Sequence, residues 1–559
     1  MKILLLTTVF LPLIGALMPL GDQRTARRRA LAVALLALAG TAILVFGYSA
    51  PSQESRVARL DWIGEPIDVH LELGLDGLSL WLFGLAALLM LTAVLVSWEA
   101  IRQQAATYYR LLLILETGML GVFAARDIIL FYVFFEFTLI PLFLLIGIWG
   151  SEQRRYAAIK FFLYTLAGSV LTFLGLLAIV LWNRAQTGVL TFSIPDLTAS
   201  LGTHPLGVSA QVWIFLALFA GFAIKVPLFP LHTWLPLAHV EAPTAGSVIL
   251  AGVLLKLGTY GFVRFCLPML PDATVICMPY LLGLSVAGIL YGALVALAQS
   301  DIKRLIAYSS ISHLGFCMLG IFALNPLGVR GGVLQMVAHG LSTGGLFALV
   351  GMMYERYHTR KIAELGGLAA ETPVLAFFML VMVLSSVALP GLSGFAAEVL
   401  ILLGMFQRAW ADAPAGWVVA YRVFAVLALS GVILGAWYML LLVERVFFGP
   451  LRRPRREAAE APVRDLSLHE VMALAPLAVF ILWIGVYPRF FIERMDPTLD
   501  TLTENAMDVA NDPASRLRLR TATAKEQAID PNFIIPPGPQ SGGVGRSNVL
   551  TTFSSSSPD

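Results

Sequence analysis

The stretch that decides the fold is AGFAIKVPLFPLHTWLPLAHVEAPTAGSVILAGVLLKLGTYG, residues 220–261. It places Lys225 in an apolar run just before Pro227, Pro230 and Pro236, and Lys256 in the middle of the next apolar run. A proline removes a backbone hydrogen-bond donor from a helix, and a charge is costly in hydrocarbon. The stretch therefore predicts that these buried lysines and prolines have a functional role and are not present for stability alone.

The composition predicts an integral membrane protein. Of 559 residues, 58% are hydrophobic and 13% are charged, against about 25% charged in ordinary soluble domains. We expect membrane lipid, not nucleic acid, around such a chain. Cys266, Cys277 and Cys317 are too widely separated to predict an iron–sulfur cluster, a zinc site or a disulfide framework.

A helix needs about 20 apolar residues to cross the hydrocarbon core of a bilayer. Applied to this sequence, that length predicts an all-α polytopic protein with about fourteen spans. Residues 3–20 resemble a signal sequence, but the many similar segments that follow favour a retained first span. The expected spans start near Ile3, Ala30, Gly74, Arg110, Asp127, Ile159, Gln211, Gly246, Met278, Leu305, Gly332, Pro373, Trp417 and His469.

Basic residues gather in alternate connections, and loops rich in lysine and arginine stay on the cytoplasmic side. The odd-numbered connections are therefore expected to face the cytoplasm (or the matrix), which puts both termini on the opposite side. We interpret Lys303, near one such connection, as part of a solvated topology signal. The basic clusters are Arg24, Arg27, Arg28 and Arg29; Arg154, Arg155 and Lys160; Lys303 and Arg304; Arg356, Arg360 and Lys361; and Arg452, Arg453, Arg455 and Arg456.

Two of the expected spans, the seventh and the twelfth, contain helix breakers. Pro227 and Pro230 leave the carbonyls of Ala223 and Val226 without helical donors, and Pro390 interrupts the later span. Discontinuous helices at matching places in two halves are typical of inverted-repeat transporters.

This pattern predicts two inverted five-helix repeats with broken helices 7 and 12. The expected organisation is helices 1–3 in residues 1–98, the two halves in 107–270 and 276–448, helix 14 in 466–488, and a disordered extramembrane tail in 493–559.

Four charged residues interrupt apolar runs: Glu136, Lys225, Lys256 and Glu398. Burial disfavours the charged form of a lysine and a nearby carboxylate favours it. A lysine whose carboxylate partner moves by a few ångström can therefore switch between holding and releasing a proton. We interpret Glu136 and Lys225 as such a pair, followed by Lys256 and then Glu398. A side chain that reaches the interface or a static ion pair is the structural alternative.

His313 and His339 lie in apolar segments between these charges, and an imidazole titrates near neutral pH. We interpret both as relay candidates, with a hydrogen-bonded core histidine as the alternative. His232 and His239 flank the first helix break, and packing or water-organising roles are the leading interpretation for these two.

The segments KVPLFPLHTWLPLAHVEAPTAGSVILAGVLLKLGTYG, DIKRLIAYSSISHLGF and FFEFTLIPLFLLIGIWG resemble the proton-translocating, antiporter-like membrane subunits of respiratory complex I. Among these subunits, the sequence is most similar to the chain M family of NADH–quinone oxidoreductase, whose mitochondrial counterpart is subunit 4. The resemblance covers roughly residues 74–488 and is absent from the C-terminal tail.

The resemblance implies that Glu136 and Lys225 respond to a neighbouring subunit, that Lys256 is the central relay, and that Glu398 handles proton exit with help from His313 and His339. It also implies that this chain holds no cofactor, because NADH, FMN, iron–sulfur clusters and quinone are bound by other subunits. The implied partners are the other complex I membrane subunits, especially chains L and N.

The implied location is a bacterial inner membrane, with the mitochondrial inner membrane as the alternative. A subunit of a multi-subunit sodium/proton antiporter, a membrane-bound hydrogenase subunit and a structural scaffold are the alternative functions, because related proteins share the lysines and the broken helices.

Overall fold

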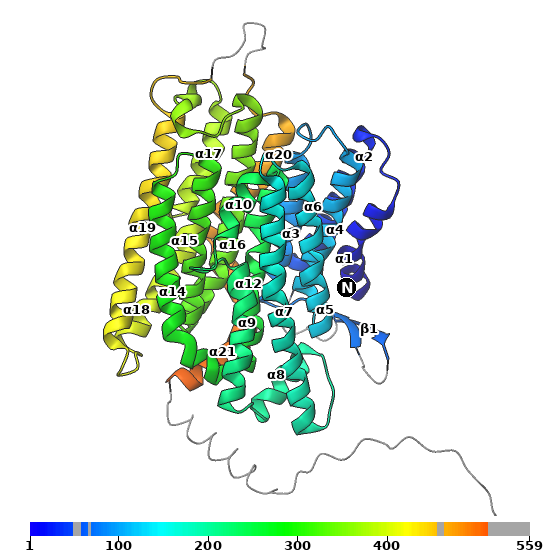
Figure 1. The fold of residues 1–559 in the computed structure, drawn as a ribbon, viewed down its shortest axis with the longest axis vertical. Helices are drawn as coiled ribbons and strands as arrows, with labels where there is room; N and C mark the ends of the chain where they lie inside the picture. The colour runs from blue at the N-terminus through cyan, green and yellow to red at the C-terminus, as the bar shows by residue number, and fades with distance from the viewer. Residues whose placement is uncertain (49–56, 65–68, 455–462, 512–559) are drawn as a thin grey trace, which may run out of the picture. The chain divides into compact units, whose positions relative to one another are not determined.

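The computed structural model describes residues 1–48, 57–64, 69–454 and 463–511, and long helices that run side by side dominate it (Figure 1). Ten helices in this part are long and apolar enough to cross a membrane, and three shorter apolar helices accompany them. The predicted all-α membrane fold is confirmed, while the count of about fourteen spans stays a prediction.

The helices of the N-terminal part are α1 (Lys2–Leu17), α2 (Gln23–Phe46), α3 (Ser79–Val96), α4 (Ala105–Ala124), α5 (Ile128–Phe137), α6 (Leu139–Trp149), α7 (Arg154–Thr187), α8 (Ile194–Thr203), α9 (Val208–Lys225), α10 (Trp234–Glu241), α11 (Thr244–Ile249), η3 (Leu250–Leu254), α12 (Lys256–Gly261), η4 (Phe262–Cys266) and α13 (Leu267–Met269). Those that follow are α14 (Pro271–Leu297), α15 (Ile302–Phe322), α16 (Pro326–Tyr357), η5 (Ile362–Glu364), η6 (Leu368–Ala370), α17 (Pro373–Ser386), α18 (Ser393–Trp410), α19 (Val418–Phe447), α20 (Leu468–Val486) and α21 (Arg489–Asn511).

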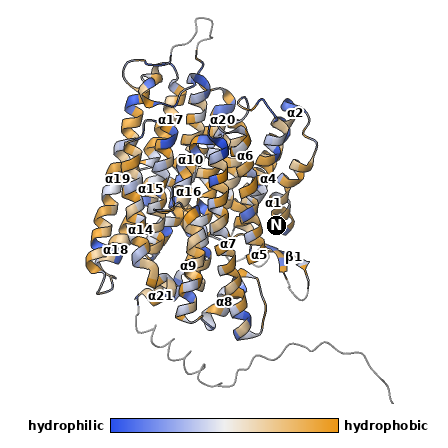
Figure 2. Cartoon of the chain, viewed as in Figure 1, coloured by the Kyte–Doolittle hydropathy of each residue, from blue (hydrophilic) through white to orange (hydrophobic). Residues whose placement is uncertain are grey.

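Burial separates interior helices from peripheral ones. The most apolar windows of Thr244–Met269 and Pro326–Tyr357 are 100% buried, whereas 39% of the Val418–Phe447 window is buried. Apolar residues cover the outer helices, as Figure 2 shows for α19. A helix that is apolar all round and buried belongs to the interior, and the outer helices suit contact with lipid.

Both predicted helix breaks are present. Helix α9 ends at Lys225 and α10 begins at Trp234, while α17 ends at Ser386 and α18 begins at Ser393. The expectation that Ala223 loses its hydrogen bond is wrong, because the Leu228 amide donates to the Ala223 carbonyl at 2.9 Å in a wider turn. The prolines therefore end α9 without leaving that carbonyl unpaired.

The interior helix Thr244–Met269 is not a regular α-helix. Two π-helical segments, η3 (Leu250–Leu254) and η4 (Phe262–Cys266), enclose α12, which begins at Lys256. In a π-helix each amide bonds to the carbonyl five residues earlier, as Leu255 does to Leu250 at 3.3 Å. Such segments are frequent at functional sites.

The predicted disorder from residue 493 is wrong for residues 493–511, which belong to α21. This helix buries one face at helical spacing, through Phe491, Met495, Leu499 and Leu502, so it has apolar surface enough to fold against the bundle. The rest of the predicted tail, residues 512–559, lies outside the described residues.

A β-hairpin adds to the predicted all-helical architecture. Strands β1 (Ala58–Ile63) and β2 (Val69–Leu73) pair in antiparallel register. The hairpin precedes α3 and meets the connection between α4 and α5, where the Arg126 amide donates to the Glu72 carbonyl at 2.9 Å.

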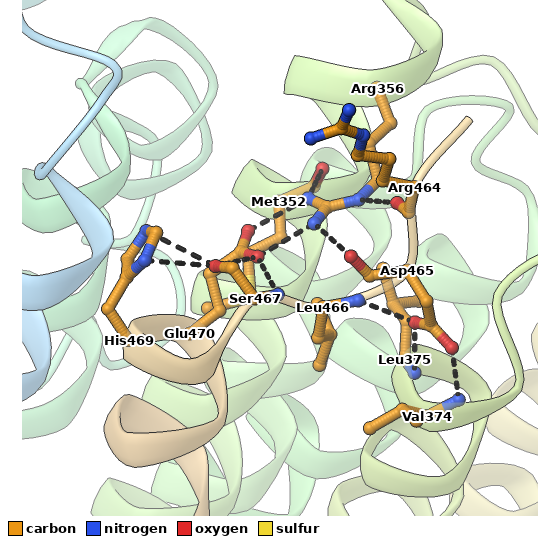
Figure 3. A network of polar contacts seen from close by, with 10 residues as sticks. All are labelled: Met352, Arg356, Val374, Leu375, Arg464, Asp465, Leu466, Ser467, His469 and Glu470. Atoms are coloured by element: carbon orange, nitrogen blue, oxygen red, sulfur yellow. Dashed lines mark hydrogen bonds and ion pairs between the residues drawn. The ribbon is translucent and has the colours of Figure 1, made fainter. Parts of the chain in front are cut away.

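A polar network ties α16, α17 and α20 together at one end of the bundle (Figure 3). Arg356 of α16 donates from both terminal nitrogens to the Glu470 carboxylate of α20, at 2.8 and 2.7 Å. Glu470 also completes a capping box with Ser467. Asp465 accepts hydrogen bonds from the Val374 amide of α17 at 2.7 Å. The network fixes the start of α20 against the two neighbouring helices.

Candidate functional site

Four of the six predicted site residues form one continuous line of contacts from four helices. The Lys256 amine lies 2.8 Å from Nδ1 of His339, and the His339 and His313 ring centroids are 5.6 Å apart. Nδ1 of His313 lies 3.5 Å from Oε1 of Glu398. These residues come from α12, α16, α15 and α18, and all four are buried. The arrangement brings together groups that can each hold a proton.

Lys256 is held by two acceptors of different kinds. Besides its contact with His339, its amine donates to the carbonyl of Ala251, which lies in the π-helical segment η3. The side chain is fully buried, so these two contacts replace the water that a free amine would bind. The wider π-helical turn places the Ala251 carbonyl where the amine reaches it.

Gln335 joins the line at Glu398, and sequence reasoning missed it. Its amide nitrogen donates to Oε1 of Glu398 at 3.2 Å, the same oxygen that faces His313. A sequence signal was available, because Gln335 precedes His339 by four residues and shares its face of α16. Polar residues four apart in an apolar helix were the pattern to search for.

Glu136 and Lys225 are near each other without a direct ion pair between these two described residues. The Lys225 amine lies 3.2 Å from the ring centroid of Phe135 and donates to the Phe135 carbonyl at 3.4 Å. Glu136 acts on Lys225 through space, and its Oε1 is buried without a hydrogen-bond partner. The lysine is therefore held by a ring face and a carbonyl rather than by the carboxylate.

A cavity of about 20 Å³ connects Lys225 with the helix that carries Lys256. Its lining includes Thr138 and Trp234, and it reaches Leu257, the residue next to Lys256. A cavity of this volume holds about one water molecule, and the lysine and a threonine hydroxyl offer it polar partners. The site can therefore take a water between the two lysine-bearing helices.

The two histidines beside the first break have different surroundings. His232 packs against the rings of Phe229 and Tyr291, with centroids 5.7 and 4.9 Å away. His239 stacks on Phe347 at 4.4 Å, and neither of its ring nitrogens has a hydrogen-bond partner among the described residues. His239 is within electrostatic range of Lys256 and Lys303, so it is better placed than His232 to bind water near the line.

Two further buried charges differ from expectation. Glu116 of α4 is fully buried, and neither carboxyl oxygen has a hydrogen-bond partner in the described part of the chain. Sequence reasoning missed it, although a glutamate in an apolar run is the signal that identified Glu136. The prediction that Lys303 is solvated is wrong, because its side chain is buried and its amine donates to the Ala242 carbonyl at 2.6 Å.

A cavity of about 550 Å³, here called the Lys303 cavity, opens beside that lysine. It is lined by residues at the end of α3, at the start of α11 and at the end of α16, including Ser97, Thr244, Lys303 and Glu355. The cavity thus touches the first residue of the helix that carries Lys256. Within the described ranges, no group of three or more His, Cys, Asp or Glu is placed to hold a metal ion.

Comparison with known proteins gives the family. The model of the family described as NADH:quinone oxidoreductase/Mrp antiporter, TM, matches residues 125–426. The NADH-quinone oxidoreductase subunit M of Rhodobacter capsulatus is 42% identical over 519 residues, which cover 90% of this chain and 97% of that protein. The chain belongs to this family.

Other members of the subunit M family agree. The NADH-ubiquinone oxidoreductase chain 4 of Chondrus crispus is 39% identical and is covered over 96% of its length, against 88% of this chain. A chain of respiratory complex I from Thermus thermophilus with bound NADH is 35% identical, with a TM-score of 0.77 over 90% of this chain and 99% of that chain.

The predicted resemblance to chain M is therefore confirmed, and the antiporter and hydrogenase alternatives are not favoured. Membership of the subunit M family makes this chain a multi-pass membrane protein and part of an oxidoreductase complex.

Proposed function

We propose that this chain is a proton-translocating membrane subunit of an NADH–quinone oxidoreductase, in which Glu136, Lys225, Lys256, His313, His339 and Glu398 carry the protons. The observation that carries this proposal is the row of neighbouring side chains from Lys256 through both histidines to Glu398. Ionisable residues inside a membrane are costly, and a connected row of them suits a proton relay.

Lys256 and His339 share the first transfer. Either nitrogen can hold the proton between them, because the amine donates when charged and the imidazole donates or accepts according to its tautomer. The outer ring nitrogens of His313 and His339 have no hydrogen-bond partner among the described residues. A water between the two rings would take the proton from one histidine and give another to the next, and Glu398 receives it through His313.

Glu136 controls the proton affinity of Lys225 in this proposal. At a separation of 4 Å and an effective dielectric constant of about 20, a carboxylate and an ammonium attract by roughly 4 kcal/mol. The two groups are apart in this structure, so closing the gap would strengthen proton binding at the lysine. The water-sized cavity beside Lys225 supports transfer from there toward Lys256.

The chain's surroundings follow from the same proposal. NADH, FMN, iron–sulfur clusters and quinone would bind in partner subunits, with chains L and N as neighbours in a bacterial inner membrane. The basic face that holds the Lys303 cavity would be cytoplasmic, both termini would lie on the other side, and the cavity would supply protons. Residues 107–270 and 276–448 would be inverted halves, which the two helix breaks support.

The decisive test replaces Lys256 in the assembled complex. Lys256→Ala should abolish most NADH-driven proton uptake into membrane vesicles, because no other titratable side chain occupies its place in the line. Lys256→Arg should be nearly as damaging, since arginine does not release a proton at working pH. A static ion-pair role predicts the opposite order, so substantial pumping by the arginine variant, normalised to assembled complex, would overturn the relay.

A further inference from the structure

The helix that carries Lys256 joins cavities at opposite faces of the bundle. Its first residue, Thr244, lines the Lys303 cavity, and Arg264 near its other end lines a second cavity of about 280 Å³. The second cavity is lined by Asp76, and we call it the Asp76 cavity. Helix α3 separates the two, because Asp76 precedes its first residue and Ser97 of the Lys303 cavity follows its last.

A bidentate ion pair stands at the inner wall of the Asp76 cavity. The guanidinium of Arg264 donates to Oδ2 of Asp76 at 2.6 Å and to Oδ1 at 2.8 Å. Oδ1 also accepts the amide of Ser79 at 3.0 Å. Both carboxylate oxygens are therefore occupied, and both side chains of this outer ion pair are nearly buried, 12% and 10% exposed for Asp76 and Arg264.

Tyr260 lies between the outer ion pair and Lys256. Residues 256, 260 and 264 are spaced by four, so they fall along one side of the helix, and eight residues span about 12 Å. Nε of Arg264 donates to the Tyr260 hydroxyl at 3.1 Å. Tyr260 is fully buried, with its ring edge-on to Phe123 at 5.3 Å. The Tyr260 hydroxyl thus extends the polar contacts of the outer ion pair along the helix in the direction of Lys256.

We propose that the outer ion pair closes this end of the Lys256 helix to protons, because Arg264 occupies the carboxylate that would otherwise pass protons between the Asp76 cavity and Tyr260. The proposal rests on the proposed role of Lys256 as a proton station. It adds a seal that keeps protons on the line toward Glu398.

The charges around Asp76 support this role. Burial alone would raise the pKa of Asp76, but the charge and hydrogen bonds of Arg264 lower it to about 2. Arg126 also lines the cavity, and its Nε donates to Oε1 of Glu72 at 3.2 Å. Without Arg264, a buried carboxylate would favour its neutral form and could take up and release protons near neutral pH.

The test measures passive proton leak through the assembled complex in liposomes, with a potassium diffusion potential and no NADH. Arg264→Gln should raise the leak roughly tenfold or more, because it frees the buried carboxylate of Asp76 to take up and release protons. The double variant Arg264→Gln with Asp76→Asn should be as tight as the wild type, because it has no carboxylate to titrate. Arg126→Gln is the matched control, since it lines the same cavity away from the Lys256 helix, and it should not leak.

Two results would overturn the proposal. A leak in both Arg264→Gln and the double variant would mean that the pair blocks protons only by packing. No leak in either variant would mean that the pair does not limit proton passage. NADH-driven pumping by Lys256→Ala at the wild-type rate would overturn the proposed function instead. The two failures are distinguishable because the leak is measured without redox turnover.

Discussion

In the proposed relay, Lys256 is a buried residue that exchanges a proton. Its amine has a carbonyl and an imidazole as partners, and only the imidazole can exchange a proton with it. The carbonyl accepts a hydrogen bond from the amine whether the amine is charged or neutral. The lysine therefore keeps a hydrogen-bond partner after it releases its proton. An arginine in this place would keep its charge, and an alanine would leave the imidazole facing a void.

Glu136 is the residue-scale test of coupling to the rest of the complex. Glu136→Ala should reduce both proton pumping and NADH–quinone turnover several-fold while the complex still assembles, since a stalled relay holds back the redox step. Both rates are measured on vesicles normalised to assembled complex. Glu152→Ala, at an exposed glutamate of the loop after α6, is the matched control. Unchanged pumping in Glu136→Ala would make Glu136 a packing residue only.

The outer ion pair also predicts a pH response. A carboxylate with a lowered folded-state pKa contributes stability above its unfolded value, near 3.9, and that stability is lost as the pH falls toward the folded value. For Asp76 the folded value is about 2. Passive leak in the wild type should therefore show no step as the outer pH falls from neutral to about 4. A step in that interval, absent from Asp76→Asn, would contradict the assigned pairing.

At the residue scale, the sequence identified the buried charged residues better than it identified which side chains are in contact. Lys256 and Glu398 could be identified as candidates from the sequence because a charged residue inside a transmembrane apolar run is costly and is rarely present without a function. The contact between His313 and Glu398 was not readable, because it depends on how α15 and α18 pack across the bundle. Gln335 was missed because a single amide in an apolar helix is ordinary on its own.

At the scale of elements, the breaks were predictable and the π-helical segments were not. Proline ends a helix for a local reason, so residues 227 and 230 suffice to predict an interruption. A π-helical turn has the same apolar composition as an α-helical turn and differs only in which carbonyl each amide bonds to. No residue pattern in 244–269 indicates that difference. The helical spacing of the apolar residues in 489–511 was a signal for α21. It was missed because the polar composition of the residues that follow led the whole C-terminal segment to be interpreted as disordered.

Gly258 is the element-scale test, because it lets α12 lie directly against the end of α9. A Cβ at this position would lie 2.5 Å from the Phe222 carbonyl oxygen and 2.9 Å from the Val226 amide nitrogen. Both are backbone atoms that cannot rotate away, so Gly258→Ala should destabilise the protein by roughly 1–3 kcal/mol. The measurement is the thermal transition of the purified complex in detergent.

Gly207→Ala is the control for this substitution, because nothing lies within 4 Å of a Cβ built there. An unchanged transition for Gly258→Ala would show that α9 and α12 separate freely. A lowered transition together with reduced pumping would indicate that the contact also positions Lys225, the last residue of α9.

At the scale of the whole molecule, orientation is testable by labelling. Glu152→Cys, at the face of the Lys303 cavity, should react with a membrane-impermeant maleimide from the cytoplasmic side only. Glu504→Cys, on the exposed side of α21, should react from the other side only. Cys277 is the native thiol to replace first, because Cys266 and Cys317 are buried. The reverse pattern would disprove the orientation drawn from the basic loops.

Helix α21 also has a consequence for how the protein is made. The Phe491 carbonyl accepts a hydrogen bond from the Trp81 indole at 3.1 Å, and Thr498 accepts one from the Gly77 amide at 2.9 Å. Between these two contacts, Asp496 pairs with Arg330 at 2.7 Å. The wall of the Asp76 cavity includes Thr501 of the same helix.

A ribosome must therefore synthesise nearly all of the described chain before these contacts can form. Until then the start of α3 lacks the neighbours that α21 supplies. A nascent chain stalled before residue 489 would present an unfinished polar pocket to the membrane proteases that remove incomplete subunits.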